Sequence, residues 1–184
     1  MRDSIIQAAT EEIGKYGFRK FTIDDIASSL GISKKTVYKY FSSKKELISS
    51  VVENHLEMEK ASALESMQIT GSILDKLNAV VFCYGQEKAP EWIIEELQQY
   101  FPEEWEKAAE LNELKSGVIR ELIQRGVESG ELRDDIRPEI ICLTLDKTID
   151  ALFDYKNLHK YDLTISQAME DVKRIVFEGI LKKE

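Results

Sequence analysis

Residues 22–45 read TIDDIASSLGISKKTVYKYFSSKK, and this stretch decides the fold. Its first half has apolar residues at the i, i+3, i+4 and i+7 spacing of one buried helical face. Those residues are Ile23, Ile26, Ala27 and Leu30. Thr22 and Asp25 are spaced to form a capping box at the start of this helix, and Gly31 can adopt the left-handed backbone that ends it. The sequence therefore predicts a short capped helix followed by a tight turn.

A second helix is expected over residues 34–41, capped by Ser33, and it is unusually polar. Its only side chains spaced to enter a core are Val37 and Phe41. Lys34 and Lys35 occupy its first turn, where the helix dipole disfavours each exposed cation by about 0.3–1 kcal/mol. A breach of a local preference is typical of a functional position, and DNA phosphates or guanine edges would offset the repulsion. The pair of helices is therefore interpreted as a DNA-reading helix-turn-helix, with a merely solvated lysine face as the alternative.

The stretch ISKKTVYKYF at residues 32–41, followed by SSKKELI, resembles the signature of TetR-family transcriptional regulators of the TetR/AcrR type. The resemblance covers about the first 50 residues, and Lys35 departs from the small residue or proline frequent in that family. It implies that Lys34, Lys35, Thr36 and Tyr38 approach bases and adjoining phosphates, and that Thr22, Tyr40 and Lys44 clamp the DNA backbone. The implied DNA-binding residues are Thr22, Ser33, Lys34, Lys35, Thr36, Tyr38, Lys39, Tyr40 and Lys44. A core position for Tyr40 stays open.

The charge distribution favours the same interpretation without any family. Residues 1–50 contain nine Lys and Arg against six Asp and Glu, whereas the rest of the chain contains 16 against 28, which gives the net charge of −9. A small basic end on an acidic protein concentrates phosphate attraction at that end. We therefore expect salt-dependent binding of double-stranded DNA, with a slope of about −0.9 per phosphate neutralised.

Length and composition limit the other possibilities. A chain of 184 residues with 43% hydrophobic residues can form a small DNA-binding domain and one larger domain. The longest apolar run, residues 79–84, is far shorter than the roughly 20 residues that cross a bilayer, and no secretory pattern is present. We expect a cytoplasmic protein without membrane contact. Cys83 and Cys142 have no CxxC spacing, so buried reduced thiols are favoured over a redox switch.

The sequence offers little for catalysis or for a cofactor. The chain has two histidines, His55 and His159, and lacks a serine elbow, a glycine-rich phosphate loop and an HExxH pair. His55 and Glu59 lie one turn apart, which supplies too few ligands for a metal site. We therefore expect no enzyme activity, no cofactor and no metal.

The remaining sequence predicts an all-α fold of about nine helices. A three-helix helix-turn-helix domain over residues 1–46 precedes a larger ligand-binding and dimerisation domain over residues 47–184. Helix boundaries are expected at 2–16, 22–30, 34–41, 43–66, 72–86, after Pro90, at 102–129, 138–157 and 164–182. The helix from Ser43 would span both domains and act as a lever.

Two features of the larger domain suggest how it works. Its last two helices carry apolar stripes broad enough for a homodimer interface, although one subunit alone could also consume them. The expected interface residues are Ile141, Leu145, Ile149, Leu152, Met169, Val172, Ile175, Val176 and Ile180. The family resemblance also implies a pocket for a small effector, expected to be apolar. Candidate lining residues are Met67, Phe82, Tyr84, Trp92, Tyr100, Phe101, Trp105 and Phe153.

Three carboxylates, Asp146, Asp150 and Asp154, recur at i, i+4 and i+8 and leave two interpretations open. They attract a cationic effector if they point inward, or they form a solvated helix edge, since buried carboxylates without partners are costly. The favoured function is a ligand-responsive regulator, most simply a repressor, that binds a palindromic operator as a homodimer and is released by a small molecule. The alternative is a constitutive DNA-binding scaffold whose acidic body recruits a protein partner.

Overall fold

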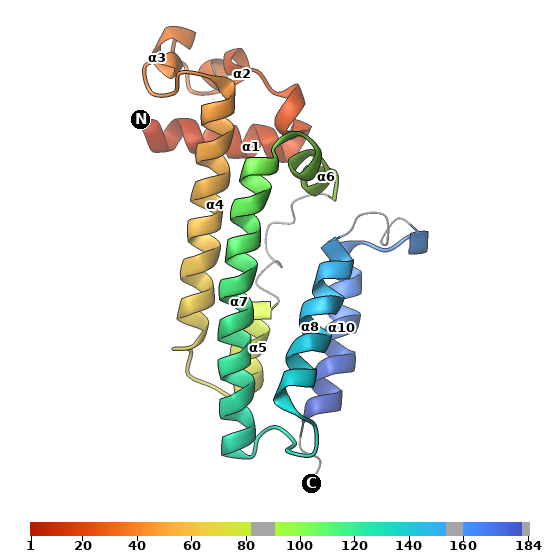
Figure 1. Cartoon of the computed structure of the whole chain (residues 1–184). Coiled ribbons are helices and arrows are strands. Elements are labelled where there is room, and N and C mark those ends of the chain that lie inside the picture. Colours follow the sequence, from red (N-terminus) through yellow and green to blue (C-terminus); the bar gives the residue numbers. More distant parts are fainter. Residues whose placement is uncertain (82–90, 154–159, 182–184) are drawn as a thin grey trace. The chain divides into compact units, whose positions relative to one another are not determined.

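The computed structural model describes residues 1–81, 91–153 and 160–181, and every regular element of more than one residue in these ranges is a helix (Figure 1). The chain divides into two compact units. The N-terminal unit comprises Met1–Glu57 and Ala89–Ala108, and the C-terminal unit comprises Met58–Lys88 and Ala109–Glu184. The predicted all-α class is thus confirmed. The functional boundary expected between residues 46 and 47 stays a prediction, since these units follow a different division.

The N-terminal unit is built from six helices or parts of helices. They are α1 (Arg2–Lys20), α2 (Ile23–Ser29), α3 (Lys34–Tyr38), the start of α4 (Lys44–Ser66), α6 (Glu91–Tyr100) and the start of α7 (Pro102–Ser129). The expected apolar positions fill its core. The largest fully buried side chains there are Ile5, Phe21, Ile26, Phe41, Leu47 and Ile48.

Local signals predicted the starts and ends of these helices well. The Thr22 side chain accepts a hydrogen bond from the backbone N of Asp25, and the Asp25 carboxylate accepts one from the Thr22 backbone N at 2.7 Å. Gly17 interrupts α1 with a φ of 87°, so the break expected there is present although the helical turns resume up to Lys20. At the start of α4, the Ser43 hydroxyl accepts a hydrogen bond from the backbone N of Glu46. The Glu46 carboxylate accepts one from the backbone N of Ser42 instead of that of Ser43.

The recognition helix α3 is shorter than the sequence suggested. It ends at Tyr38, and the chain continues as a turn in which the backbone N atoms of Tyr40 and Phe41 donate to the carbonyl of Val37. Phe41 is nevertheless buried. The buried Phe41 ring holds the turn against the core, although the regular helix has already ended at Tyr38.

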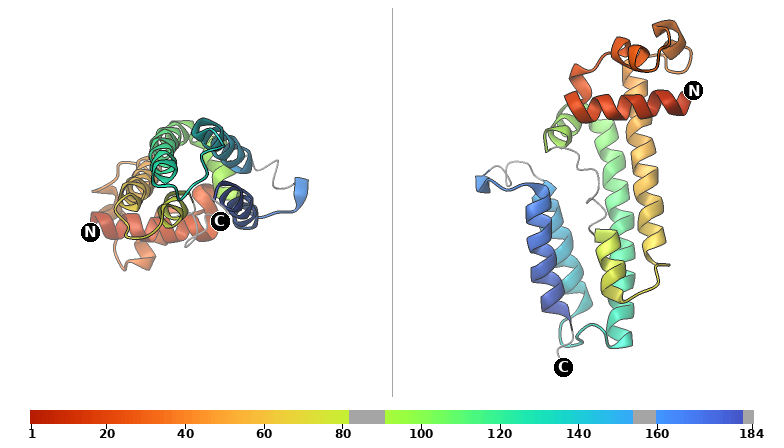
Figure 2. Two further views of the ribbon diagram at one scale, coloured as in Figure 1. Left: turned by 90° about the horizontal axis from the view of Figure 1, so that it is seen from below. Right: turned by 180° about the vertical axis from the view of Figure 1, so that it is seen from behind.

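The C-terminal unit contains the later parts of α4 and α7 together with α5 (Ile73–Val81), α8 (Pro138–Phe153) and α10 (Ile165–Ile180). Helices α8 and α10 lie side by side (Figure 2). Its core is formed by Leu77, Leu122, Ile123, Leu132 and Leu145 with their neighbours. Ser72 and Thr164 cap α5 and α10 at the starts predicted for these helices, and the predicted start and end of α7 are confirmed.

The sequence also led to expectations about the two cysteines and about membrane-spanning helices. Cys142 lies in the apolar core, and its burial raises the pKa of the thiol, as expected of an inert cysteine. Cys83 lies outside the described residues. Within the described ranges no helix is long and apolar enough to cross a bilayer.

Candidate nucleic-acid interface and ligand pocket

The recognition helix is held by one capping residue and one buried anchor. The hydroxyl of Ser33 accepts a hydrogen bond from the backbone N of Thr36 at 3.1 Å, and the two hydroxyls are 2.9 Å apart. Val37 is fully buried. Because Val37 faces the core, the side chains of Lys35 and Tyr38 are directed to the other side of this short helix. The predicted capping role of Ser33 is confirmed.

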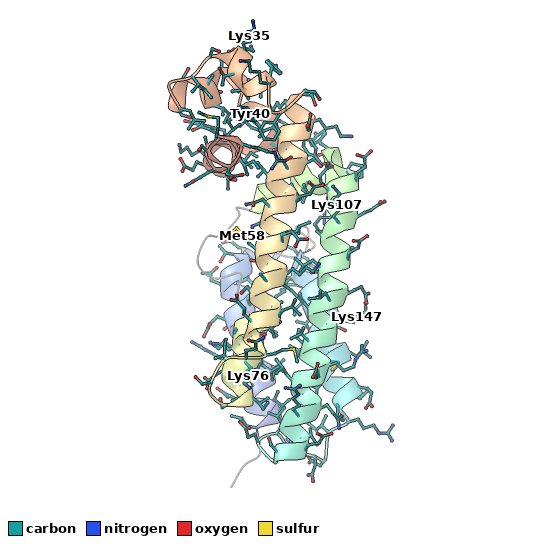
Figure 3. All side chains as sticks on the ribbon, turned by 90° about the vertical axis from the view of Figure 1, so that its left-hand side faces the viewer. Lys35, Tyr40, Met58, Lys76, Lys107 and Lys147 are labelled. Atoms are coloured by element: carbon teal, nitrogen blue, oxygen red, sulfur yellow. The ribbon has the colours of Figure 1, made fainter. Side chains whose placement is uncertain are left out.

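The outward surface of the motif carries cations and tyrosines. Tyr38 is 45% exposed and Tyr40 is 42% exposed, so the core position left open for Tyr40 does not apply. Lys35 and Lys39 are exposed, and neither forms an ion pair with another described residue. Figure 3 shows Lys35 at the end of the N-terminal unit, with its side chain directed away from the other helices of that unit. These groups are available to phosphates and base edges.

Lys34 is exposed as well, but it already has an acidic partner. Its Nζ donates to the Asp24 carboxylate of α2 at 2.9 Å. The hydrogen bond and the charge of Asp24 raise the pKa of Lys34. Both side chains are at least half exposed, so the pair is weak and a phosphate can compete for the ammonium group.

Two residues expected to clamp the DNA backbone are engaged within the protein. The Thr22 hydroxyl serves the capping box of α2. Lys44 is half-buried, and its Nζ donates to the backbone carbonyls of Arg19 at 2.9 Å and Phe21 at 2.6 Å. Burial lowers the pKa of Lys44. Lys44 thus satisfies carbonyls at the end of α1, where the helix dipole favours a cation, and its expected contact with a DNA phosphate stays a prediction.

Contacts of α1 with α6 and the start of α7 were not foreseen from the sequence. Arg19 donates to the Tyr100 hydroxyl at 3.1 Å and lies over its ring at 4.4 Å. The rings of Phe18 and Phe101 are 5.3 Å apart. Their sequence separation of about 80 residues gives no local signal, since periodicity reports a buried face and not its partner. Tyr100 and Phe101 were expected to line a ligand pocket, and here they support the helix-turn-helix instead.

The C-terminal unit contains a pocket of about 40 Å³ between α5, α7 and α8. It is lined by Val80, Val81, Asn112, Lys115, Ser116, Ile119, Asp146, Ile149 and Asp150. None of the predicted lining residues whose side chains the structure describes, namely Met67, Tyr100, Phe101 and Trp105, is among these residues. Met67 packs against the core of this unit, and Trp105 is half-buried. Phe82 and Tyr84 lie outside the described residues, as do the side chains of Trp92 and Phe153.

Most of the expected dimer residues lie in the core of their own subunit. Ile141, Leu145, Met169, Val172, Val176 and Ile180 are each at most 9% exposed. Ile149 and Leu152 are half-buried against the same core, and Ile175 alone of the nine is largely exposed, at 74%. Because α8 and α10 pack on each other and on α7, the broad stripes are used mainly within one chain, and the sequence interpretation needs this correction.

The described residues contain no group of three or more His, Cys, Asp or Glu placed to hold a metal ion. His55 is exposed, and Glu59 is instead 2.6 Å from the ammonium group of Lys115. Of the two residues His55 and Glu59, Glu59 therefore forms an ion pair with Lys115 of α7.

The chain thus combines a capped helix with an exposed cationic and aromatic face in one unit and a pocket in a second helical unit, a combination typical of helix-turn-helix regulators. Residues 5–51 match the family described as bacterial regulatory proteins, tetR family. The HTH-type transcriptional repressor NicS of Pseudomonas putida is 30% identical over 145 residues, which are 73% of this chain and 67% of NicS. The chain belongs to the TetR family of transcriptional regulators, as the motif of residues 32–41 predicted.

Other comparisons extend over nearly the whole chain. The uncharacterised HTH-type transcriptional regulator YvaF of Bacillus subtilis is 25% identical over 185 residues, 99% of this chain and 97% of YvaF. A regulator from Saccharomonospora viridis, in complex with choline, has a TM-score of 0.76 at 18% identity and covers 99% and 98% of the two chains. FadR from Bacillus subtilis, in complex with stearoyl-CoA, has a TM-score of 0.65 at 19% identity and covers 96% and 97%. These structures share the fold of both units.

Proposed function

We propose that the protein is a ligand-responsive repressor that binds a palindromic operator as a homodimer. The observation that carries this proposal is the outward face of α3, on which Lys35 and Tyr38 are exposed while Val37 anchors the helix. Lysine can bind guanine edges or phosphates, and a tyrosine hydroxyl can bind a phosphate. Residues 1–46 would act as the DNA-binding domain and residues 47–184 as the regulatory and dimerisation domain, in the cytoplasm where bacterial DNA lies.

The homodimer follows from the way paired recognition helices read DNA. Two such helices reach successive major grooves about 34–36 Å apart, so a two-fold dimer reads a palindrome. The revised candidate interface is the exposed apolar surface of α8 and α10. Ile140 and Leu143 of α8 are 52% and 53% exposed, and Ile175 of α10 is 74% exposed.

The dimer is tested by sedimentation at micromolar concentration. Ile175→Asp places a charge on the proposed interface, and we expect it to yield monomers because an unpaired charge is costly to bury. Ile69→Asp, on an exposed apolar residue outside α8 and α10, is the matched control and should remain dimeric. A monomeric wild-type protein would contradict the proposal.

Repression is the direction supported by a relative. NicS, 30% identical to this chain, is a transcriptional repressor. A dimer that occupies a promoter can block polymerase with no further contact. Transcription from a template with the bound operator should therefore fall on addition of the protein, and a rise would assign an activator instead.

Release by an effector is supported by the ligands of similar structures and by the pocket in the C-terminal unit. Similar regulators have been determined with choline and with stearoyl-CoA. An effector must bind the DNA-free shape more tightly than the DNA-bound shape, and a coupling of about 1–3 kcal/mol suffices. Helix α4 contributes residues to both units and is the proposed lever.

The alternative, a constitutive scaffold that recruits a protein through its acidic body, makes a different prediction. A regulator of the proposed kind has at least one small molecule that weakens operator binding. Fluorescence anisotropy of labelled operator during titration with a metabolite panel measures this. A scaffold would keep its operator affinity with every compound.

A further inference from the structure

The pocket of the C-terminal unit has one apolar wall and one polar wall. Val80 and Val81 of α5, Ile119 of α7 and Ile149 of α8 form the apolar side. At about 40 Å³ the pocket has more than the roughly 10–15 Å³ that one water molecule needs, yet it is far smaller than a drug-sized site. Its dimensions therefore suit a small polar head group with a short alkyl part.

Two of the three charged groups on the polar wall already have partners of opposite charge. Lys115 is almost fully buried, and its Nζ donates to the Glu59 carboxylate at 2.6 Å. Asp150 is 3.0 Å from the ammonium group of Lys147. The charges of Lys115 and Asp150 are therefore each balanced by an opposite charge.

Asp146 differs, because its described partner carries no charge. Its carboxylate accepts a hydrogen bond from the Ser116 hydroxyl at 2.8 Å, and no lysine, arginine or histidine among the described residues lies within 4.0 Å. A carboxylate offers about four lone-pair sites, so Asp146 retains acceptor capacity and a net negative charge at a half-buried position.

We propose that this pocket binds the ammonium head of a small amine, with the ammonium nitrogen donating to Asp146 and the alkyl part against Ile119 and Ile149. The proposal rests on the proposed function, since it names the chemical class of the effector that the regulatory unit binds. A charge-assisted bond to a carboxylate is roughly twice as strong as a neutral one, which supplies selectivity for a cation.

The same arrangement disfavours the other two classes of head group. A carboxylate or phosphate ligand would face Asp146 and find the Lys115 ammonium already paired with Glu59. An alcohol would offer Asp146 only a neutral donor. The negative charge of Asp146 would then stay uncompensated in a half-buried site. The sequence-based expectation of an apolar effector is thus narrowed to one with a cationic head.

The test uses the full-length protein free of DNA and three probes that differ only in the head group. Propylamine, protonated at pH 7, is compared with 1-propanol and propionate by NMR, with the methyl signals of Ile119 and Ile149 as local reporters. We expect saturable shifts with propylamine alone. Asp146→Asn should weaken its binding by about tenfold or more, the loss expected for one charge-assisted interaction.

A control variant separates a specific site from general attraction to an acidic protein. Asp171→Asn removes the same charge from an exposed position on α10. It should bind propylamine within about twofold of wild type, since Asp171 is not among the described residues that line the pocket. Equal binding by Asp146→Asn, saturable binding of 1-propanol or propionate, or no shift with propylamine would overturn the proposal. Failure of the proposed function would appear separately, as loss of operator binding, which this titration does not involve.

Discussion

Lys44 distinguishes two roles that the sequence alone could not separate, and Lys44→Met tests them. Methionine keeps most of the apolar stem but removes the ammonium group. That group donates to the carbonyls of Arg19 and Phe21 and lies 4.2 Å from the centroid of the Phe21 ring. The variant leaves both carbonyls at the end of α1 without this donor.

The expected loss can be worked from these contacts. A hydrogen bond to a charged group contributes about 1.5–3 kcal/mol, and two such bonds set the upper range. The site is half-exposed, so water can satisfy part of the vacated carbonyls. We therefore expect the free energy of unfolding to fall by about 2 kcal/mol in total, which corresponds to a decrease in Tm of roughly 4–8 °C for a chain of this size.

Urea and thermal unfolding measure the loss, with operator affinity measured below the transition. Lys45→Met is the matched control, because Lys45 is exposed and pairs with Glu103, and an exposed pair contributes at most about 1 kcal/mol. If Lys44→Met kept the wild-type Tm but lost operator affinity, Lys44 would be a phosphate clamp and the structural role given to it here would be refuted.

The remaining predictions concern the recognition surface and its cap. Lys35→Ala should weaken operator binding, measured by anisotropy, while Tm stays unchanged; if Lys35 binds a phosphate, the salt slope also falls by about 0.9. Asp24→Asn should tighten operator binding and raise its salt dependence, because Lys34 is released from its acidic partner; unchanged affinity would show that the pair does not compete with DNA. For Asp25, the hydrogen bonds from the side chain and then the backbone of Thr22 lower the carboxyl pKa. The carboxylate thus contributes stability that is present above about pH 3.9, the unfolded value, and is lost as the pH falls through the lower folded pKa. Asp25→Asn should therefore unfold at a lower Tm than wild type at pH 6, with a difference that shrinks below about pH 4; a gap that persists at pH 2 would exclude ionisation as its cause.

The sequence predicted the helices and caps well because those signals are local. The box of Thr22 with Asp25, the cap at Ser33 and the ends of α7 depend on residues a few positions apart. Local spacing also identified the exposed face of this segment, since Val37 and Phe41 are the only buried residues between positions 34 and 41.

The contacts that the sequence did not predict join residues that are distant in sequence. Lys44 meets carbonyls 23 and 25 residues away, and Tyr100 meets Arg19 across 81 residues. Apolar periodicity on α8 and α10 showed that residues such as Leu145 are buried. It could not show whether the same chain or a second copy of the protein covers these residues. Among the described lining residues the sequence singled out Asp146 and Asp150, but it gave the aliphatic ones no role in the pocket, because aromatic content was used as the guide.

Selection of bound fragments from a random DNA pool tests the central claim most directly. The account predicts enrichment of one palindrome whose half-site centres are separated by about 10–10.5 base pairs or a multiple, recovered by wild type and not by the double variant Lys35→Ala, Tyr38→Ala. Recovery of no symmetric motif, or of the same motif by the double variant, would contradict a dimer that reads DNA through the outward face of α3.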